Sequence, residues 1–421
     1  MNKLSERSVV AFRARLVAWY ARHKRAMPWR GTRDAYRVWV SEVMLQQTRV
    51  AAVEPYYRRF VKKFPTLRAL ARARGEYVLK MWAGLGYYSR ARNLHRAARE
   101  MVAKHGGKFP REVEAALALP GVGRYTAAAV LSIAYDKPLA VLDGNVARVV
   151  ARLGGVRGDL RAAGRWKKLE EKAQELMGAE SGETGKQEEV RKRGREEGKS
   201  TTGAALPHSM ALRAGRRRDH GPADRLESLS YERRQDAGGT KPGEWNQAMM
   251  ELGATVCTPR APRCEECPVA RWCRARKLGL VEKIPSARKK REAVKVTIAA
   301  AVFLDGFGYT LLVKPGRADA DGYFSGLWQF PAVEVRKNAT AELHRHLKES
   351  LHFHAEQLDP LPAAKHSVTY REITLRPFLI LTGRLPKKKA ARSAPLSWVE
   401  RLAVSSATKK IARIAERSVA G

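Results

Sequence analysis

All four cysteines of this 421-residue chain lie in one short segment. They are Cys257, Cys264, Cys267 and Cys273, spaced C-x6-C-x2-C-x5-C. Scattered structural thiols would not cluster in this way, and disulfides are rare in reducing compartments. The pattern therefore predicts a metal site whose four thiolates close the coordination shell, which makes the site structural rather than catalytic. Tetrahedral zinc and a 4Fe–4S cluster both fit four thiolates, and the spacing alone leaves that choice open.

The charge of the chain predicts its kind of partner. Lys and Arg number 81 against 42 Asp and Glu, a formal net charge of +39. Solubility alone rarely needs so large an excess of one sign, whereas a polyanion such as nucleic acid favours it. We therefore expect DNA binding that weakens steeply with salt.

The lengths of the apolar runs indicate whether the chain is expected to enter a membrane. The longest runs, 127–135 and 297–304, are too short for a membrane span, and the N-terminal residues lack the features of a signal peptide. We expect no membrane association and a monomer that works beside the DNA, in a bacterial cytoplasm and associated with the nucleoid.

Shifts in composition divide the chain and predict a multidomain fold class. Residues 1–177 and 244–280 have helical periodicity, broken at Gly and Pro, which predicts an all-α domain. Residues 178–243 form a charged insert with few aromatics, predicted to be disordered, and 281–293 read as a linker. Residues 294–421 contain β-branched and alternating segments around one helical stretch, Ala339–Leu351, and predict an α+β domain.

Two glycines precede a predicted helix in the string LPGVGRYTAAAVLSIAY, residues 119–135. Gly121 and Gly123 would let main-chain N–H groups approach a DNA phosphate at the helix N-terminus, although two glycines alone also fit a tight turn. The whole string resembles the helix–hairpin–helix of base-excision DNA glycosylases.

Further strings extend this resemblance, and in order and spacing they are similar to the MutY family of adenine DNA glycosylases. They are SEVMLQQT (41–48), GLGYYSRARNLH (84–95), VLDGNVARV (141–149), NQAMMELGA (246–254) and the four cysteines. The resemblance covers nearly all of the chain except the insert. It implies a helix–hairpin–helix glycosylase domain and a 4Fe–4S cluster rather than zinc.

Two acidic residues carry the chemistry that this resemblance implies. Hydrolysis of a glycosidic bond needs one carboxyl group to protonate the leaving group and a second to stabilise the sugar cation. By position alone, Glu42 is a solvated residue at a helix edge and Asp143 is a helix N-cap. The resemblance implies instead that Glu42 protonates adenine N7 and then handles water. It also implies that Asp143 stabilises the sugar or bonds to it transiently, and that Asn145 holds Asp143 or the sugar.

Tyr125 sets the expected outcome of the reaction. The related endonuclease III type has a lysine at the equivalent position, and that lysine attacks the sugar and cleaves the strand. Tyrosine cannot form a Schiff base, so the resemblance implies base removal without efficient strand cleavage.

Adenine must leave the duplex stack before it can be removed. The resemblance implies that Gln47 and Tyr87 wedge into the helix, and that Leu85 lies near the opposing base. It also implies that Arg25, Trp29 and Arg30 line the adenine pocket or its approach. The alternative for Trp29 and Tyr87 is a place in the core, where aromatic side chains are more common.

The string GLWQFPAVEV, residues 326–335, resembles the Nudix-like domain with which MutY enzymes recognise 8-oxoguanine opposite adenine. The predicted helix Ala339–Leu351 lacks the Gly-x5-Glu-x7-Arg-Glu pattern that binds magnesium, so we expect no pyrophosphatase activity. Val368, Thr369 and Tyr370 stand where the family's lesion-reading hairpin commonly has Phe-Ser-His. Thr369 keeps a hydroxyl and Tyr370 a polar aromatic ring, and the alternative is an ordinary surface hairpin.

The predicted function is therefore monofunctional removal of adenine opposite 8-oxoguanine or guanine in double-stranded DNA, as part of base excision repair. One alternative is a MutY-like thymine mismatch glycosylase, against which Glu42 and the C-terminal domain count. The other is a non-catalytic iron–sulfur DNA-binding protein, which leaves Glu42, Asp143 and Tyr125 unexplained.

Overall fold

The structure is a computed structural model that describes residues 5–162, 164–178, 240–286, 292–314, 326–368, 370–388 and 391–420. Contacts between Cα atoms divide the chain into two units, which we describe separately. The first comprises Met1–Arg25 and Ala128–Ala287, and the second Ala26–Ala127 and Arg288–Gly421. The predicted insert 178–243 lies outside the described residues, apart from its ends at 178 and 240–243.

The first unit is helical, as the periodicity of these segments predicts. Helix α13 packs against α1 and α9, and its Trp245 is fully buried. At Gly253 of α13 an added Cβ would meet the Cβ of Asn145 at 2.8 Å, so only glycine allows this close approach of α13 to α9. The helices are α1 (Glu6–His23), α8 (Arg124–Tyr135, which begins in the second unit), α9 (Gly144–Gly154), α10 (Arg165–Met177), α13 (Pro242–Thr255) and α14 (Arg274–Lys277), with short 3-10 turns η2 (Cys264–Glu266) and η3 (Ala270–Trp272).

The N-terminal part of the second unit is also helical. Helix α6 packs against α4 and α5, and α2 against α3. Aromatic edges join these helices, because the ring of Phe60 contacts the rings of Phe64 and Trp82 at centroid distances of 4.8 and 5.9 Å. The helices are α2 (Ala35–Leu45), α3 (Val50–Lys63), α4 (Leu67–Arg72), α5 (Gly75–Trp82), α6 (Tyr88–Lys104) and α7 (Val113–Leu117). Across the described ranges, no helix has the length and apolar content needed to cross a bilayer.

In the C-terminal part of the second unit, the described residues form two sheets and two α-helices. Strands β1 and β6 pair in parallel from Val294↔Arg371 to Leu304↔Leu381, in a sheet of order β3-β1-β6-β4 in which β5 also pairs with β6. Strands β2 and β7 form the second sheet. The elements are β1 (Val294–Leu304), β2 (Tyr309–Val313), β3 (Ala332–Val335), α15 (Ala339–Leu351), β4 (Asp359–Pro360), β5 (Ala364–Val368), β6 (Arg371–Leu381), β7 (Ala391–Pro395), η4 (Leu396–Arg401) and α16 (Ser406–Ala420).

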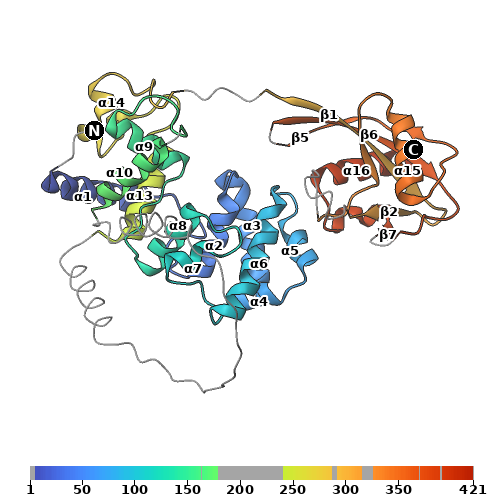
Figure 1. The fold of residues 1–421 in the computed structure, drawn as a ribbon, viewed down its shortest axis with the longest axis horizontal. Helices are drawn as coiled ribbons and strands as arrows, with labels where there is room; N and C mark the ends of the chain where they lie inside the picture. The colour runs from blue at the N-terminus through green and yellow to red at the C-terminus, as the bar shows by residue number, and fades with distance from the viewer. Residues whose placement is uncertain are drawn as a thin grey trace, which may run out of the picture. The chain divides into compact units, whose positions relative to one another are not determined.

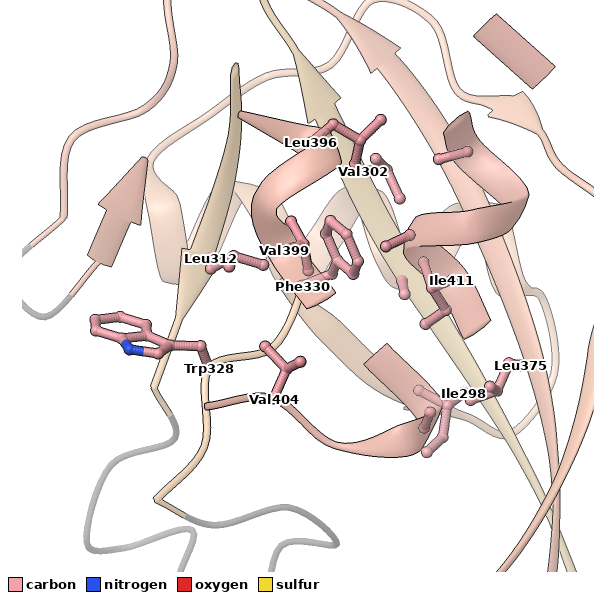
Figure 2. Packing of buried hydrophobic residues seen from close by; sticks show 14 of the residues in the cluster. Ile298, Val302, Leu312, Trp328, Phe330, Leu375, Leu396, Val399, Val404 and Ile411 are labelled. Carbon is pink, nitrogen blue, oxygen red and sulfur yellow. The ribbon is translucent and has the colours of Figure 1, made fainter. Parts of the chain in front are cut away.

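Alternate residues of β1 face two different cores. Val302 belongs to a cluster with Ile411 of α16, whereas Phe303 packs with Leu343 of α15. Helices α15 and α16 therefore cover opposite faces of the main sheet (Figure 1). Figure 2 shows the α16 side of this packing, with Phe330 beside Val399. This layered arrangement confirms the predicted α+β class.

Strand β6 runs through Pro377. Proline lacks the N–H that a central strand normally donates. Here it lies where the partner of β6 changes, because β5 pairs with 371–375 and β4 with 378–379. The strand therefore continues past the proline without interruption of the parallel pairing with β1.

Candidate active site

Glu42 lies on α2 and is 6% exposed. The expectation of a solvated helix-edge residue is therefore wrong for this side chain. The phenol of Tyr125, in the first turn of α8, donates a hydrogen bond to Glu42 Oε2 at 2.6 Å. A second contact between the same elements is the bond from Gln46 Nε2 to Thr126 Oγ1 at 3.1 Å. Together these bonds place a buried carboxyl group against a tyrosine hydroxyl.

Asp143 is the N-cap of α9, as its position before the helix indicates. Its Oδ1 accepts from the N–H of Val146 at 2.7 Å, and its Oδ2 accepts from Asn145 Nδ2 at 3.2 Å. Burial raises the pKa of Asp143, although hydrogen bonds from the backbone act in the opposite direction. A carboxylate whose charge is poorly solvated gains more from a nearby cation than an exposed one does.

Arg148 joins this pair to the cysteine segment, and sequence reasoning missed it. The side chain is buried, and its Nη2 donates to Asn145 Oδ1 at 3.0 Å and to the carbonyl of Gly253 at 2.6 Å. Its Nε donates to the carbonyl of Cys257 at 2.8 Å. The only available signal was an arginine on an otherwise apolar stretch of α9.

The four cysteines line one cavity in the first unit. The turns η2 and η3 bring them there, with N–H bonds from Cys267 to Cys264 O and from Cys273 to Ala270 O. Arg152, 1% exposed, donates to Cys257 Sγ at 3.2 Å and to the carbonyl of Thr258 at 2.7 Å. Burial raises the pKa of Cys267 to about 12, so binding of a metal must displace protons from such thiols.

This set of donors fits an iron–sulfur cluster. Four thiolates are the usual ligands of such clusters, and a buried guanidinium suits their negative charge. Among the described residues, no three His, Cys, Asp or Glu side chains gather closely enough for a single metal ion.

Gln47 and Tyr87 line a second cavity, of about 250 Å³, in the second unit. Both are exposed, and both have left-handed backbones, with φ of 58° and 48°. Such a conformation costs free energy in residues other than glycine and is concentrated at functional sites. Gly121, with φ of 76°, lines the same cavity, and an added Cβ there would meet Asn93 Cβ at 2.7 Å. The structure thus brings together three of the predicted DNA-contacting residues.

Arg90 holds the backbone around this cavity, and it is the second residue that sequence reasoning missed. It is 7% exposed and donates to the carbonyls of Val43 and Met44 at 3.0 and 2.9 Å, and also to that of Gln46. It reaches Thr48 Oγ1 at 3.1 Å as well. Burial lowers the pKa of Arg90 to about 10, which leaves it charged at neutral pH.

Other predicted residues lie in the core or in ion pairs. Leu85 and Trp29 are each 7% exposed, and the Trp29 ring packs edge-on against Tyr57 at 5.3 Å. The alternative of a core position therefore describes Trp29, whereas the neighbouring Arg30 is half-buried. Arg25 belongs to the first unit and binds both carboxylate oxygens of Glu251, at 2.7 and 2.9 Å.

The predicted turn before α8 and the predicted hairpin are both present. Gly123 has open space where a Cβ would stand, and α8 begins at the next residue. Val368 of β5 pairs with Arg371 of β6. Thr369 lies outside the described residues, and Tyr370 is half-buried with the Arg371 guanidinium 5.3 Å from its ring.

Sequence comparisons agree with this geometry. Residues 40–177 match the family of HhH-GPD superfamily base excision DNA repair proteins, and residues 257–273 match the iron–sulfur binding domain of endonuclease III. Residues 40–177 therefore have the helix–hairpin–helix fold of this superfamily, and Cys257, Cys264, Cys267 and Cys273 bind a 4Fe–4S cluster. This confirms the predicted helix–hairpin–helix class and the choice of iron–sulfur over zinc.

Named relatives narrow the class. An adenine DNA glycosylase of Rattus norvegicus is 32% identical over 97% of this chain and 78% of its own length. The adenine DNA glycosylase of Homo sapiens is 40% identical over 64% of this chain and 40% of its length. A thermostable thymine-DNA glycosylase of known structure is 24% identical, with a TM-score of 0.46 over 65% of this chain and 99% of that chain. The chain belongs to the adenine DNA glycosylase family.

Proposed function

We propose that this protein removes adenine opposite 8-oxoguanine or guanine in double-stranded DNA and leaves the strand intact. The observation that carries the proposal is the buried Glu42 carboxyl group held at 2.6 Å by the Tyr125 hydroxyl, in a chain of the adenine glycosylase family. Hydrolysis of an N-glycosidic bond needs a carboxylic acid shielded from bulk water and aimed by a fixed partner.

The two acidic residues have different roles in this scheme. Glu42 protonates adenine N7, which makes the base a better leaving group, and it then accepts a proton from the attacking water. Asp143 faces the sugar as positive charge develops, and its raised pKa reflects the poor solvation that makes this attraction strong. Asn145 keeps Oδ2 of Asp143 in place through its 3.2 Å bond.

Tyr125 accounts for the expected absence of strand cleavage. A phenol offers no amine for a Schiff base with the sugar, and its bond to Glu42 gives it a positioning role instead. The cluster bound by the four cysteines fixes the segment whose Cys257 carbonyl Arg148 contacts, so we assign it a structural role.

In our proposal, Gln47 and Tyr87 insert into the base stack of the duplex and so help adenine to leave it. Their side chains are exposed, their backbones are held in costly conformations, and they border the same cavity as Gly121. Such residues suit insertion into a base stack, since rigid placement lowers the cost of opening the duplex. Arg25 and Trp29 act in our proposal as supports of the adenine pocket, because their contacts lie within the protein.

We assign recognition of the opposing lesion to a Nudix-like domain, residues 294–421. The hairpin of β5 and β6 carries Tyr370 at its turn, where an aromatic ring can contact the oxidised base. Residues 1–177 with 244–280 form the catalytic domain in this scheme, 178–243 an insert and 281–293 a linker. The protein acts on DNA as a monomer at the nucleoid.

Single-turnover base release tests the proposal. The substrates are duplexes with adenine opposite 8-oxoguanine, guanine or thymine, and one with thymine opposite guanine. We expect adenine release to be fastest opposite 8-oxoguanine, without strand breaks until alkali is added. Thymine release would transfer the assignment to a thymine mismatch enzyme. Glu42→Gln separates an enzyme from a binding protein, because it abolishes turnover and preserves duplex affinity only if Glu42 is the acid.

A further inference from the structure

The turn between β1 and β2 presents a phenylalanine to solvent. Phe307 is 89% exposed. Asp305 Oδ1 accepts from the N–H groups of Phe307 and Tyr309 at 3.0 and 2.8 Å, and the N–H of Gly308 donates to the Asp305 carbonyl at 3.0 Å. Gly308 has φ of +77°, which favours glycine. Because these bonds close the turn, the backbone that carries the exposed ring is held in one conformation.

A basic loop lies beside this turn. It follows β6, and its Thr382 N–H donates to the carbonyl of Leu304 at the end of β1, at 3.0 Å. The loop carries Arg384, Lys387 and Lys388, which are all exposed. Counting only residues that the structure describes, none of these three cations has an ion-pair partner. Three cations therefore lie in a loop next to a turn whose backbone is held in place and which exposes an aromatic ring.

Turn and loop border one open groove of about 400 Å³, which we call the Phe307 groove. Its lining includes the apolar side chains of Phe307, Tyr309 and Leu385, the three loop cations and Arg392. An aromatic surface beside several cations is the pattern that binds unpaired nucleotides, because bases stack on the rings and phosphates contact the cations.

We propose that the Phe307 groove binds single-stranded DNA. An unpaired base stacks on Phe307, and the adjoining phosphates contact Arg384, Lys387 and Lys388. Bases within a duplex have no free face for such stacking. The carboxylates of an acidic peptide would contact the cations alone, so the exposed aromatic ring beside them favours nucleic acid. The site goes beyond adenine removal, because it uses neither Glu42 nor Asp143.

Photocross-linking of the full-length, cluster-loaded protein tests this site. The probe is an eight-nucleotide thymidine oligomer containing one 5-iododeoxyuridine, and peptide mass spectrometry locates the linked residue. We expect linkage at Phe307 or Tyr309, with a yield that saturates as the oligomer is titrated. The apparent Kd from that titration belongs to the groove and not to other basic surfaces of the chain.

Charge-matched variants complete the test. Lys387→Ser with Lys388→Ser removes two groove cations and keeps the aromatic rings, whereas Lys337→Ser with Lys348→Ser removes two exposed lysines elsewhere in the same C-terminal part. The first pair should lower the slope of log Kd against log salt by about 0.7 for each phosphate that a lysine no longer neutralises, and the second should leave it unchanged. Adenine release from a blunt-ended duplex that carries adenine opposite 8-oxoguanine and has no single-stranded overhang should be the same in both.

Four results would overturn the proposal. The first is cross-linking outside residues 305–309, and the second is an equal effect of the two variant pairs on the salt dependence. The third is a polyglutamate peptide that displaces the photoreactive oligomer as effectively as unlabelled oligomer does. The fourth is displacement of that oligomer by free thymidine triphosphate at equal concentration. The third result would identify an acidic partner and the fourth a free nucleotide. None of them bears on whether Glu42 is the acid, so this test and that of the excision reaction fail independently.

Discussion

Replacement of Arg90 tests how the cavity at Gln47 and Tyr87 is held in shape. Arg90 lies on α6 and donates to carbonyls at the C-terminal end of α2 and to the Thr48 hydroxyl just beyond it. It also reaches the carbonyls of Leu85 and Gly86, at 3.4 and 3.3 Å, immediately before Tyr87. The Arg90 guanidinium therefore connects the segment that carries Gln47 with the segment that carries Tyr87.

The magnitude follows from the acceptors that lose their donor. Arg90→Met leaves the carbonyls of Val43, Met44 and Gln46 without this charged donor, in a site that is 7% exposed. A buried acceptor without a partner costs about 1–3 kcal/mol, and the three lie close enough to share water if the site opens. We therefore expect a loss of about 4 kcal/mol in local stability. Arg90→Lys keeps the charge but not the planar fork, and should lose about 2 kcal/mol.

Hydrogen exchange followed by mass spectrometry measures the loss of stability around Arg90 peptide by peptide. A local measurement is needed because a chain with more than one unit does not unfold in a single step. Peptides from α2 and from 84–90 should exchange roughly a thousandfold faster in Arg90→Met. Arg96→Met is the control, since Arg96 lies on the same helix, is exposed, and bonds only to Asn93 at 3.2 Å among the contacts that the structure describes.

Excision provides the second readout. If the cavity holds Gln47 and Tyr87 in position for insertion into the duplex, Arg90→Met should slow adenine release in single turnover while Arg96→Met does not. Normal protection of the α2 and 84–90 peptides in Arg90→Met would refute the assignment of Arg90 as the tie between them. Loss of protection with unchanged excision would show that Gln47 and Tyr87 need no fixed backbone for catalysis.

Further expectations concern the acidic site. Asp143→Asn should keep the melting temperature within about 2 °C, because asparagine caps helices as well as aspartate, yet should abolish excision; loss of folding would contradict this. Since burial raises the pKa of Asp143, wild-type excision should fall as pH drops through a value above 3.8, and a pH–rate profile without that limb would refute the role. Tyr125→Lys should introduce strand cleavage that borohydride traps as a covalent adduct, and no adduct would show that the amine cannot reach the sugar. Arg148→Gln should lower excision about tenfold or more through Asn145, measured beside Asn145→Ala; additive losses in the double variant would disprove that they act together.

The sequence predicted the elements whose signals are local. Helix α15 begins and ends at the predicted residues, because helical periodicity is read within one segment. Helix α16 was not predicted. Its buried face is formed largely by Ala407, Ala412 and Ala415, which give only a weak apolar signal until the sheet that they cover is known.

The residues of the candidate site also differ in how far the sequence alone could predict them. The positions of Glu42, Asp143 and Tyr125 follow from motifs, but the burial of Glu42 depends on contacts with segments far away in the sequence. Arg90 and Arg148 could not be identified, because a buried arginine resembles a solvated one until its acceptors are known. Those acceptors are main-chain carbonyls, which have no signature in the sequence.

The pairing of α1 with α13 has a consequence for synthesis of the protein. Tyr20 Oη donates to Gln247 Oε1 at 2.9 Å, across 227 residues of chain. At about 5–20 residues per second, a ribosome needs roughly 11–45 s to deliver the second partner after the first. Throughout that interval the apolar face of α1, with Phe12, Leu16 and Trp19, lacks α13, one of the helices that pack against α1. Helix α1 thus waits for α13 during synthesis, and chaperones that bind exposed apolar segments can bind the nascent chain in that interval.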